Sequence, residues 1–156
     1  MTDQTALCFR RATRGDLKAI IDLLASDPLG KGREVVSEEP DAAYTAAFEA
    51  IERDANQLLA VGTLADGTVA ACLQLSFVPG LSRHGQWRGQ MESVRVAEAA
   101  RGRGAGRQMM EWAIDECRRR GCGLVQLTSD KTRRDAIRFY ESLGFVASHE
   151  GLKLKL

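Results

Sequence analysis

The sequence of 156 residues has no long hydrophobic run, and none of its apolar stretches approaches the roughly 20 residues that a membrane-spanning helix needs. Residues 1–13 interleave charged and apolar side chains and contain no apolar segment typical of a secretory signal. Neither charge is in excess, since 22 basic residues stand against 21 acidic ones. We therefore expect a cytoplasmic protein without a membrane partner, and no global positive field that would attract nucleic acid.

Residues that bind metals are scarce. The four cysteines form no C-x-x-C pair, and His84 and His149 are the only histidines in the sequence. Structural zinc sites are built from closely spaced pairs of such residues. We therefore predict no metal, and we expect the cysteines to be reduced and to serve as small hydrophobic residues.

The composition, 44% hydrophobic and 28% charged, predicts one domain over residues 1–156 with a sizeable core. No repeat or linker divides the chain. Apolar periodicity and turn signals predict the order strand, two helices, three strands, helix, strand, helix, and one or two final strands over 145–156. This order is typical of an α/β (α+β) fold with a mixed, mostly antiparallel central sheet flanked by about four helices.

A glycine-rich stretch, Ala100–Arg107, lies between a predicted strand over 86–96 and a predicted helix that starts near Gly104. Its three alternate glycines lack a Cβ atom, so the backbone can adopt strained angles and direct its N–H groups at one point. The start of the helix adds partial positive charge, and three arginines add full charges. The stretch therefore predicts a site for a phosphate-bearing ligand.

Other phosphate-binding motifs fit the stretch less well. The chain contains no Walker motif, and a dinucleotide fingerprint that starts at Gly102 would need glycine where Arg107 stands. Gly102, Gly104 and Gly106 also resemble the loop of S-adenosylmethionine methyltransferases, with Asp130 as the ribose-binding acid. Only 50 residues follow Gly106, too few for the remaining units of a doubly wound sheet. The methyltransferase is therefore the weaker alternative.

Two segments together resemble the GNAT superfamily of N-acetyltransferases. Arg101-x-x-Gly104-x-Gly106 resembles the pyrophosphate loop R/Q-x-x-G-x-G/A, and residues 136–145 are similar to the family's A-x-x-x-Y-x-x-x-G-F segment. The resemblance covers residues 86–146, while residues 1–85 agree only in the order of their elements. It implies an acetyltransferase that uses acetyl-CoA as co-substrate and needs no metal.

The resemblance also implies where coenzyme A binds. In the family, the strand before the glycine loop and the strand after the next helix splay apart, and the pantetheine arm lies between them. The implied cofactor-binding residues are Val94, Arg95, Val96, Arg101, Gly102, Arg103, Gly104, Ala105, Gly106 and Arg107. One position departs from the family: Arg133 replaces a common asparagine, so a polar contact is lost or is replaced by a charge contact to a phosphate or an acidic substrate.

Acyl transfer to an amine needs a base, because the amine is protonated at neutral pH, and it benefits from an acid that protonates the departing thiolate. Tyr140 matches the family tyrosine near the cofactor sulfur and is the expected acid. Glu92, on the strand that borders the thioester, is the expected base, directly or through water. The competing interpretations are a core aromatic at position 140, a Glu92 paired with Arg88 or Arg95, and His149 as the base.

The predicted reaction is direct attack by a primary amine in a ternary complex, without an acyl-enzyme. A non-catalytic acyl-CoA-binding or sensing domain is the main alternative. Nucleic-acid binding through Arg118–Arg120 and Arg133-Arg134 is disfavoured, because the net charge is near neutral and no aromatic residues are interleaved with these arginines. The resemblance places the acceptor between residues 30–39 and the C-terminal strands. Small amines, amino acids, aminoglycoside-like drugs and proteins are all possible acceptors, of which we expect a small-molecule amine. The acyl length stays open, and a homodimer is a family expectation.

Overall fold

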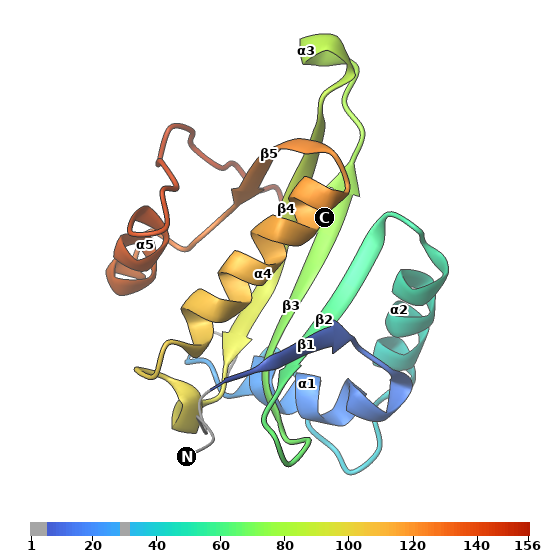
Figure 1. Cartoon of the computed structure of the whole chain (residues 1–156). Helices are drawn as coiled ribbons and strands as arrows, with labels where there is room; N and C mark the ends of the chain where they lie inside the picture. The colour runs from blue at the N-terminus through green and yellow to red at the C-terminus, as the bar shows by residue number, and fades with distance from the viewer. Residues whose placement is uncertain (1–5, 29–31) are drawn as a thin grey trace.

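The computed structural model describes residues 6–28 and 32–156 of the chain. Its centre is a five-stranded sheet in the order β1-β2-β3-β4-β5 (Figure 1). The strands are β1 Cys8–Arg11, β2 Gln57–Thr63, β3 Val69–Val78, β4 Trp87–Val96 and β5 Cys122–Leu127. The first three pairs are antiparallel and β4 pairs with β5 in parallel. The predicted mixed, mostly antiparallel sheet is therefore confirmed.

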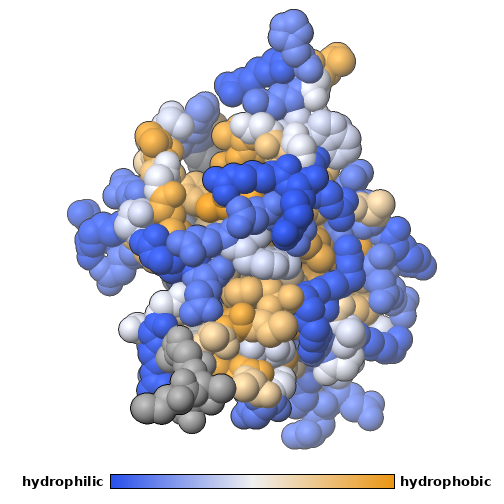
Figure 2. Space-filling model, in the orientation of Figure 1, coloured by the Kyte–Doolittle hydropathy of each residue, from blue (hydrophilic) through white to orange (hydrophobic). Residues whose placement is uncertain are grey.

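Helices cover both faces of this sheet (Figure 1). The α-helices are α1 Leu17–Ala25, α2 Ala42–Arg53, the single turn α3 Ser82–Gly85, α4 Ala105–Arg119 and α5 Arg134–Glu141. Two 3-10 turns, η1 Arg14–Asp16 and η2 Glu98–Ala100, precede α1 and the glycine-rich loop. None of the helices in the described ranges is long and apolar enough to cross a membrane, and hydrophilic side chains occupy much of the face shown in Figure 2.

The alternation of side chains along the strands divides the core into two layers. Leu58 and Leu73 pack with Met109 and Met110 of α4 on one face. Leu59, Val61 and Cys72 pack with α1 and α2 on the other face. Because successive strand residues point to opposite faces, the neighbours Leu58 and Leu59 enter different layers. These two layers fix α4 on the face opposite α1 and α2.

A buried carboxylate fixes the start of α1. Asp16 Oδ2 accepts hydrogen bonds from the backbone N–H of Thr13 at 2.7 Å and from its hydroxyl at 2.9 Å. The Arg10 guanidinium donates to both carboxylate oxygens, at 2.7 and 2.9 Å. The hydrogen bonds from Arg10 lower the pKa of Asp16 to about 2, against the opposing effect of burial. Asp16 thus joins β1 to α1.

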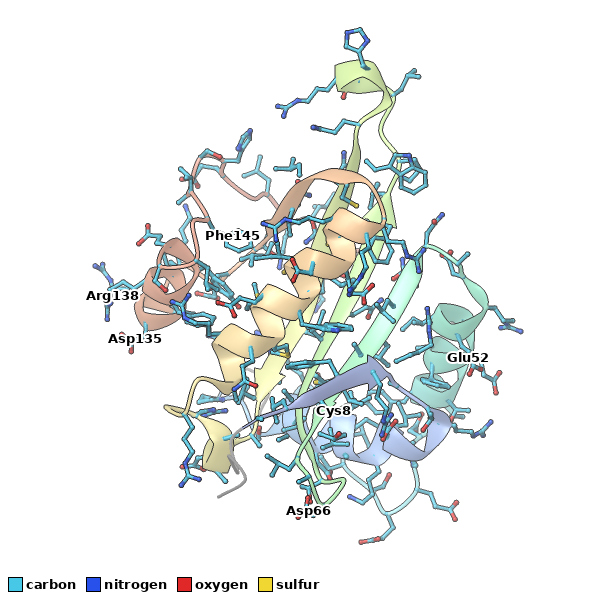
Figure 3. The ribbon with its side chains drawn as sticks, viewed as in Figure 1. Cys8, Glu52, Asp66, Asp135, Arg138 and Phe145 are labelled. Atoms are coloured by element: carbon cyan, nitrogen blue, oxygen red, sulfur yellow. The ribbon has the colours of Figure 1, made fainter. Side chains whose placement is uncertain are left out.

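The amphipathic helix α5 is packed against this frame by its apolar side. Asp135 and Arg138 form an ion pair and lie on the side of α5 that faces solvent (Figure 3). On the other side, the ring of Tyr140 meets Phe145 edge to face, with a centroid distance of 6.0 Å. Phe139, Tyr140 and Phe145 all pack against the layer beneath α4. The packing fixes Tyr140 beside the sheet.

The prediction of one or two strands over residues 145–156 is wrong, because this segment has no regular secondary structure. The side chains of Leu152, Leu154 and Leu156 alternate with lysines, as in a strand, but are 96%, 87% and 110% exposed. A strand is stabilised by a hydrogen-bonded neighbour and by cover over its apolar side. The described segment has neither, so the alternating pattern by itself does not produce a strand.

Candidate active site

Strands β4 and β5 separate halfway along β4, as the resemblance implies. Their pairing runs from Trp87, opposite Cys122, to Met91, opposite Leu127. Residues 92–96 of β4 then continue without a strand partner on this side among the described residues. An extended ligand can therefore pair with backbone groups along this edge, where the carbonyl oxygens of Val94 and Val96 each accept one hydrogen bond from an arginine side chain. Pantetheine, with two amides in an extended chain, fits such an edge.

The part of β4 that does not pair with β5 has a bulge near its start, opposite β3. The register between β3 and β4 shifts between Cys72 and Gln74, and Ser93 lies in the left-handed region with a φ of 54°. Bulges twist a strand and are frequent beside functional sites. The bulge turns Val94 and Val96 toward the layer beneath α4, where both side chains pack.

The glycines of the loop have two different roles. Gly102 and Gly104 have φ values of 71° and 82°, and Gly104 is the N-cap of α4. These angles favour glycine because a Cβ atom would be strained there. Gly106 instead lies inside α4, where an added Cβ would stand 3.4 Å from the ring of Phe139. Only the first two glycines therefore shape the loop, and the third packs against Phe139 of α5.

The three arginines of the loop diverge. Arg101 Nε donates to the carbonyl oxygen of Val96 at 3.0 Å. Arg107 lies 3.6 Å from Glu111 and donates to the Ser142 hydroxyl at 3.3 Å. Arg103 lines a separate pocket. Arg101 and Arg107 have to exchange or share these contacts before their guanidinium groups can bind a pyrophosphate.

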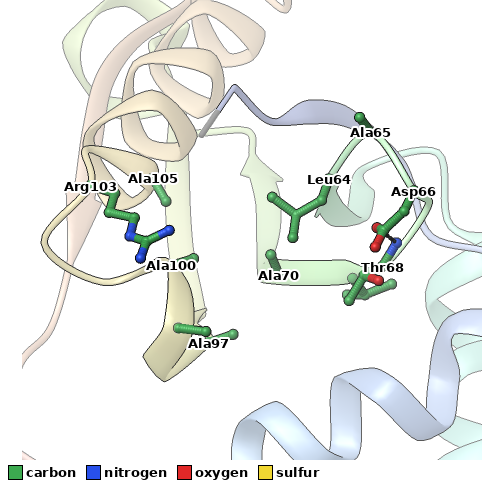
Figure 4. Close-up of a pocket in the computed structure, with 11 residues that line it drawn as sticks. Leu64, Ala65, Asp66, Thr68, Ala70, Ala97, Ala100, Arg103 and Ala105 are labelled. Atoms are coloured by element: carbon green, nitrogen blue, oxygen red, sulfur yellow. Dashed lines mark hydrogen bonds between the residues drawn. The ribbon is translucent and has the colours of Figure 1, made fainter. Parts of the chain in front are cut away.

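The pocket that Arg103 lines has a volume of about 430 Å³. It lies between the turn that joins β2 to β3 and the η2 segment, and its walls are mostly alanines and other apolar residues (Figure 4). Asp66 and Thr68 stand on the turn side, opposite Arg103 (Figure 4). No residue of β5 or α5 lines it. The pocket is therefore distinct from the opening between β4 and β5.

Tyr140 lies half-buried beside this opening. Burial raises the pKa of its hydroxyl, and the charges of Arg133 and Arg95 oppose part of that rise. The hydroxyl is therefore protonated at neutral pH and is able to donate a hydrogen bond. The ring packs against Phe139 at a centroid distance of 5.4 Å. Tyr140 is thus both a packed aromatic and an available proton donor.

Glu92, the expected base, lies at the surface. It is exposed on β4, opposite Gln74 of β3, just before the bulge. Among the described residues it forms no ion pair with Arg88 or Arg95, so the interpretation of a paired carboxylate is wrong. Its register with Gln74 places it on the sheet face of α1 and α2, because Gln74 pairs with Leu59 of that layer. Glu92 therefore borders the opening from the side opposite α4.

Sequence reasoning missed a row of polar side chains on the same sheet face. Gln57, Ser76, Gln90 and Gln126 occupy matching positions on β2, β3, β4 and β5. Ser76 donates to Gln57 at 2.9 Å, and Gln126 donates to Gln90 at 2.7 Å. Each residue looks like an ordinary polar strand residue, so the row becomes visible only from the register. It forms a hydrogen-bonding surface next to Glu92.

Sequence reasoning also missed that Arg95 and Arg133 meet at one carboxylate. Asp27, two residues beyond α1, lies 3.3 Å from Arg95 Nε and 3.4 Å from Arg133 Nη2. A second nitrogen of Arg95, Nη1, donates to the carbonyl oxygen of Val94 at 2.9 Å. The sequence gives only one signal, the arginine at position 133 where the family commonly has asparagine.

Other side chains able to take part in catalysis are His149 and the four cysteines. His149 is exposed and contacts the neighbouring Ser148 hydroxyl at 2.8 Å. All four cysteines are free, and burial raises the pKa of Cys72 and Cys117 to about 12, so these two thiols stay protonated. In the described ranges, no three His, Cys, Asp or Glu residues gather as a metal site would need. Gly30 and Lys31 of the expected acceptor segment lie outside the described residues.

Solved structures with the same fold include close relatives. A transcriptional regulator from Bacillus halodurans C-125 is 45% identical, with a TM-score of 0.93 over 97% of this chain and 100% of that chain. A putative acetyltransferase from Agrobacterium tumefaciens str. C58 is 31% identical, with a TM-score of 0.80 over 96% of this chain and 99% of that chain.

Sequence comparison points to the same group of proteins. The aminoalkylphosphonate N-acetyltransferase of Salmonella typhimurium is 38% identical over 66 residues, which span 42% of this chain and 43% of that relative. The streptothricin acetyltransferase of Streptomyces lavendulae is 29% identical over 143 residues, 90% of this chain and 69% of that relative. Residues 17–145 match the family described as acetyltransferase (GNAT) family. The resemblance seen in the motifs is confirmed, and the chain belongs to the acetyltransferase (GNAT) family.

Proposed function

We propose that the protein transfers an acetyl group from acetyl-CoA to the primary amine of a small molecule, by direct attack in a ternary complex. The observation that carries the proposal is the unpaired edge of β4, residues 92–96, which leads directly into the glycine loop and α4. Residues 1–156 would form a single N-acetyltransferase domain. The proposal that it works in the cytoplasm rests on the four free cysteines.

The backbone of Val94 and Val96 would hold the pantetheine arm of coenzyme A, which supplies the thioester. Both carbonyl oxygens already accept a hydrogen bond from an arginine side chain, Val94 from Arg95 and Val96 from Arg101. A carbonyl has two lone pairs, so each can accept a second bond from a ligand amide. The backbone amides of residues 102–107 would bind the pyrophosphate at the start of α4.

Tyr140 and Glu92 would divide the proton transfers between them. Glu92, exposed at the border of the opening, would accept the proton that the amine has to lose, directly or through water. Tyr140, kept protonated by burial, would donate to the sulfur as the bond between carbon and sulfur breaks. The acceptor would approach over the polar row of Gln57, Ser76, Gln90 and Gln126, which suits a small polar amine.

The names of the relatives support a small-molecule acceptor, since one acts on aminoalkylphosphonates and another on streptothricin. A homodimer is proposed from the family alone. The second candidate function is an acyl-CoA sensor without catalysis, which the similarity to a protein described as a transcriptional regulator favours. The presence of Tyr140 and Glu92 beside the opening favours the enzyme.

Isothermal titration with acetyl-CoA tests the proposal, with S-adenosylmethionine and NAD as control ligands. Gly104→Leu should weaken binding at least tenfold, because Gly104 holds the loop in a left-handed conformation. Gly121→Leu is the matched control: Gly121 also has a positive φ, 74°, but follows α4 at its far end. Thiol release with a panel of amines then separates enzyme from sensor. Acetyl-CoA binding without thiol release would identify a sensor. Tighter binding of S-adenosylmethionine or NAD than of acetyl-CoA would overturn both the enzyme and the sensor.

A further inference from the structure

Three charged residues from distant parts of the sequence meet beside the opening between β4 and β5. Asp27 follows α1, Arg95 belongs to the unpaired part of β4, and Arg133 immediately precedes α5. The side chain of Asp27 is 6% exposed, that of Arg95 is 19% exposed and that of Arg133 is 38% exposed. Asp27 thus anchors two guanidinium groups, of which that of Arg133 is the more accessible to a ligand.

The cluster carries more positive than negative charge. The hydrogen bonds with Thr132 lower the pKa of Asp130 most strongly, and the positive charge of Arg33 lowers it further. Arg133 acts on Asp130 in the same direction. Arg95 and Arg133 share the single carboxylate of Asp27, so these three side chains together carry one more positive than negative charge.

The position of the cluster favours the acceptor over the phosphates of coenzyme A. Arg95 is the register partner of Cys72, which packs in the layer beneath α1 and α2, whereas the glycine loop leads into α4 on the opposite face. Along α5, Arg107 of the loop contacts Ser142 at the C-terminal end. Arg133 lies at the other end of α5, nine residues earlier, or about 13 Å along the helix axis.

The cluster also lies close to the proposed chemistry. The charges of Arg133 and Arg95 both act on the Tyr140 hydroxyl, the proposed proton donor. Arg133 is the N-cap of α5, which carries Tyr140, and Arg95 lies between Val94 and Val96 on β4, so both guanidiniums belong to elements that border the opening. A planar guanidinium binds carboxylate and phosphonate oxygens through two parallel hydrogen bonds.

We propose that Arg133, held by Asp27 and supported by Arg95, recognises an oxyanion on the acceptor, so that the substrates are small amines that carry a carboxylate, phosphate or phosphonate group. This inference rests on the proposed function and narrows its acceptor. Arg133 is thus a specificity-determining residue, and its presence in place of asparagine adds charge on the acceptor side of the site.

The test compares three acceptors of the same length: β-alanine, 2-aminoethylphosphonate and propylamine. The wild-type protein should prefer the two anionic amines over propylamine by at least tenfold in kcat/KM, as expected for a hydrogen bond between charged groups. In Arg133→Gln this preference should fall at least tenfold, while Arg133→Lys should retain part of it. Arg134→Gln, an exposed neighbour on the same helix, is the matched control and should keep the full preference. In the Arg133 variants Asp27 keeps Arg95 as a partner, so the fold should persist.

A titration of 2-aminoethylphosphonate, with and without coenzyme A, measures the anion contact independently of turnover. If the wild-type protein acetylates all three amines equally, or if Arg133→Gln keeps the preference, the inference fails while the proposed function stands. A loss of acetyl-CoA affinity in Arg133→Gln without a change in preference would assign Arg133 to the cofactor instead. If no amine is acetylated, the proposed function fails, and the titration still decides the anion site: absence of binding, or equal binding to Arg133→Gln, overturns it. The ratio of the kcat/KM values for β-alanine and 2-aminoethylphosphonate shows whether the site prefers a carboxylate or a phosphonate.

Discussion

The ring of Phe139 on α5 lies beside Gly106 on α4, 3.4 Å from the position that a Cβ atom would take. This is an ordinary van der Waals distance, so alanine fits there. Gly106 is therefore not required for its backbone angles, in contrast to Gly104, whose φ is 82°. Glycine thus occurs at these two positions of one motif for different physical reasons. Measuring the stability of a substitution at each position can distinguish these reasons.

Gly104→Ala should lower the free energy of unfolding by about 1 kcal/mol, because a Cβ atom is strained in the left-handed region. Gly106→Ala should leave stability unchanged or raise it by up to about 1 kcal/mol, since alanine favours the helix. Urea denaturation of both variants beside the wild type measures the difference. Equal destabilisation by the two substitutions would contradict the separate roles of these glycines.

Asp16 should make stability depend on pH in the acid range. Its pKa in the folded protein, about 2, lies below the ordinary value of 3.8, so its contribution is fully present above about pH 4 and is lost as the pH falls toward 2. The shift corresponds to about 2 kcal/mol. Unfolding free energies measured between pH 5 and 2.5 should decline more steeply for the wild type than for Asp16→Asn.

Asp22→Asn is the control for this measurement. Asp22 pairs with Lys18 at 2.9 Å on the exposed side of α1, and such pairs contribute little. We expect a change of less than about 0.5 kcal/mol. An Asp16→Asn profile that runs parallel to the wild type would show that Arg10 does not hold the carboxylate as the structure indicates.

Tyr140→Phe should lower kcat for acetyl transfer by about 100-fold or more, the usual contribution of a positioned general acid. The ring keeps its contacts with Phe139 and Phe145, and the hydroxyl makes no hydrogen bond to the described residues. The melting temperature should therefore stay close to that of the wild type. A normal kcat in Tyr140→Phe would show that Tyr140 contributes packing and no proton transfer.

Glu92→Gln should reduce kcat/KM at neutral pH by about tenfold or more with propylamine, because this amine has to lose a proton before it attacks. With trifluoroethylamine, which is largely unprotonated at neutral pH, the reduction should be smaller. The control is Glu98→Gln, which replaces an exposed carboxylate in η2 with a carboxamide. An equal reduction for both amines would argue for a positioning role of Glu92 in place of proton transfer.

Local chemistry made much of the fold predictable. Asp66-Gly67 between two apolar runs is a hairpin signal, and the structure forms the hairpin of β2 and β3 there, with a φ of 87° at Gly67. The alternate glycines before an amphipathic run likewise predict the loop and α4. The C-terminal segment shows the limit of such patterns, because alternation predicts a strand only when a neighbouring strand is present to pair with it.

The sequence by itself determined the glycine loop, the order of the five strands and of the longer helices up to α5, and the motif around Tyr140, because turn geometry, helical periodicity and motif spacing act over a few residues. Only the tertiary structure decided that Arg133 meets Asp27 and Arg95, and that Glu92 stands exposed beside a row of polar side chains. Asp27 and Arg133 are separated by most of the chain, and the face on which each side chain lies depends on strand register and on the bulge at Ser93. Contacts of this kind follow from packing, so no local pattern encodes them.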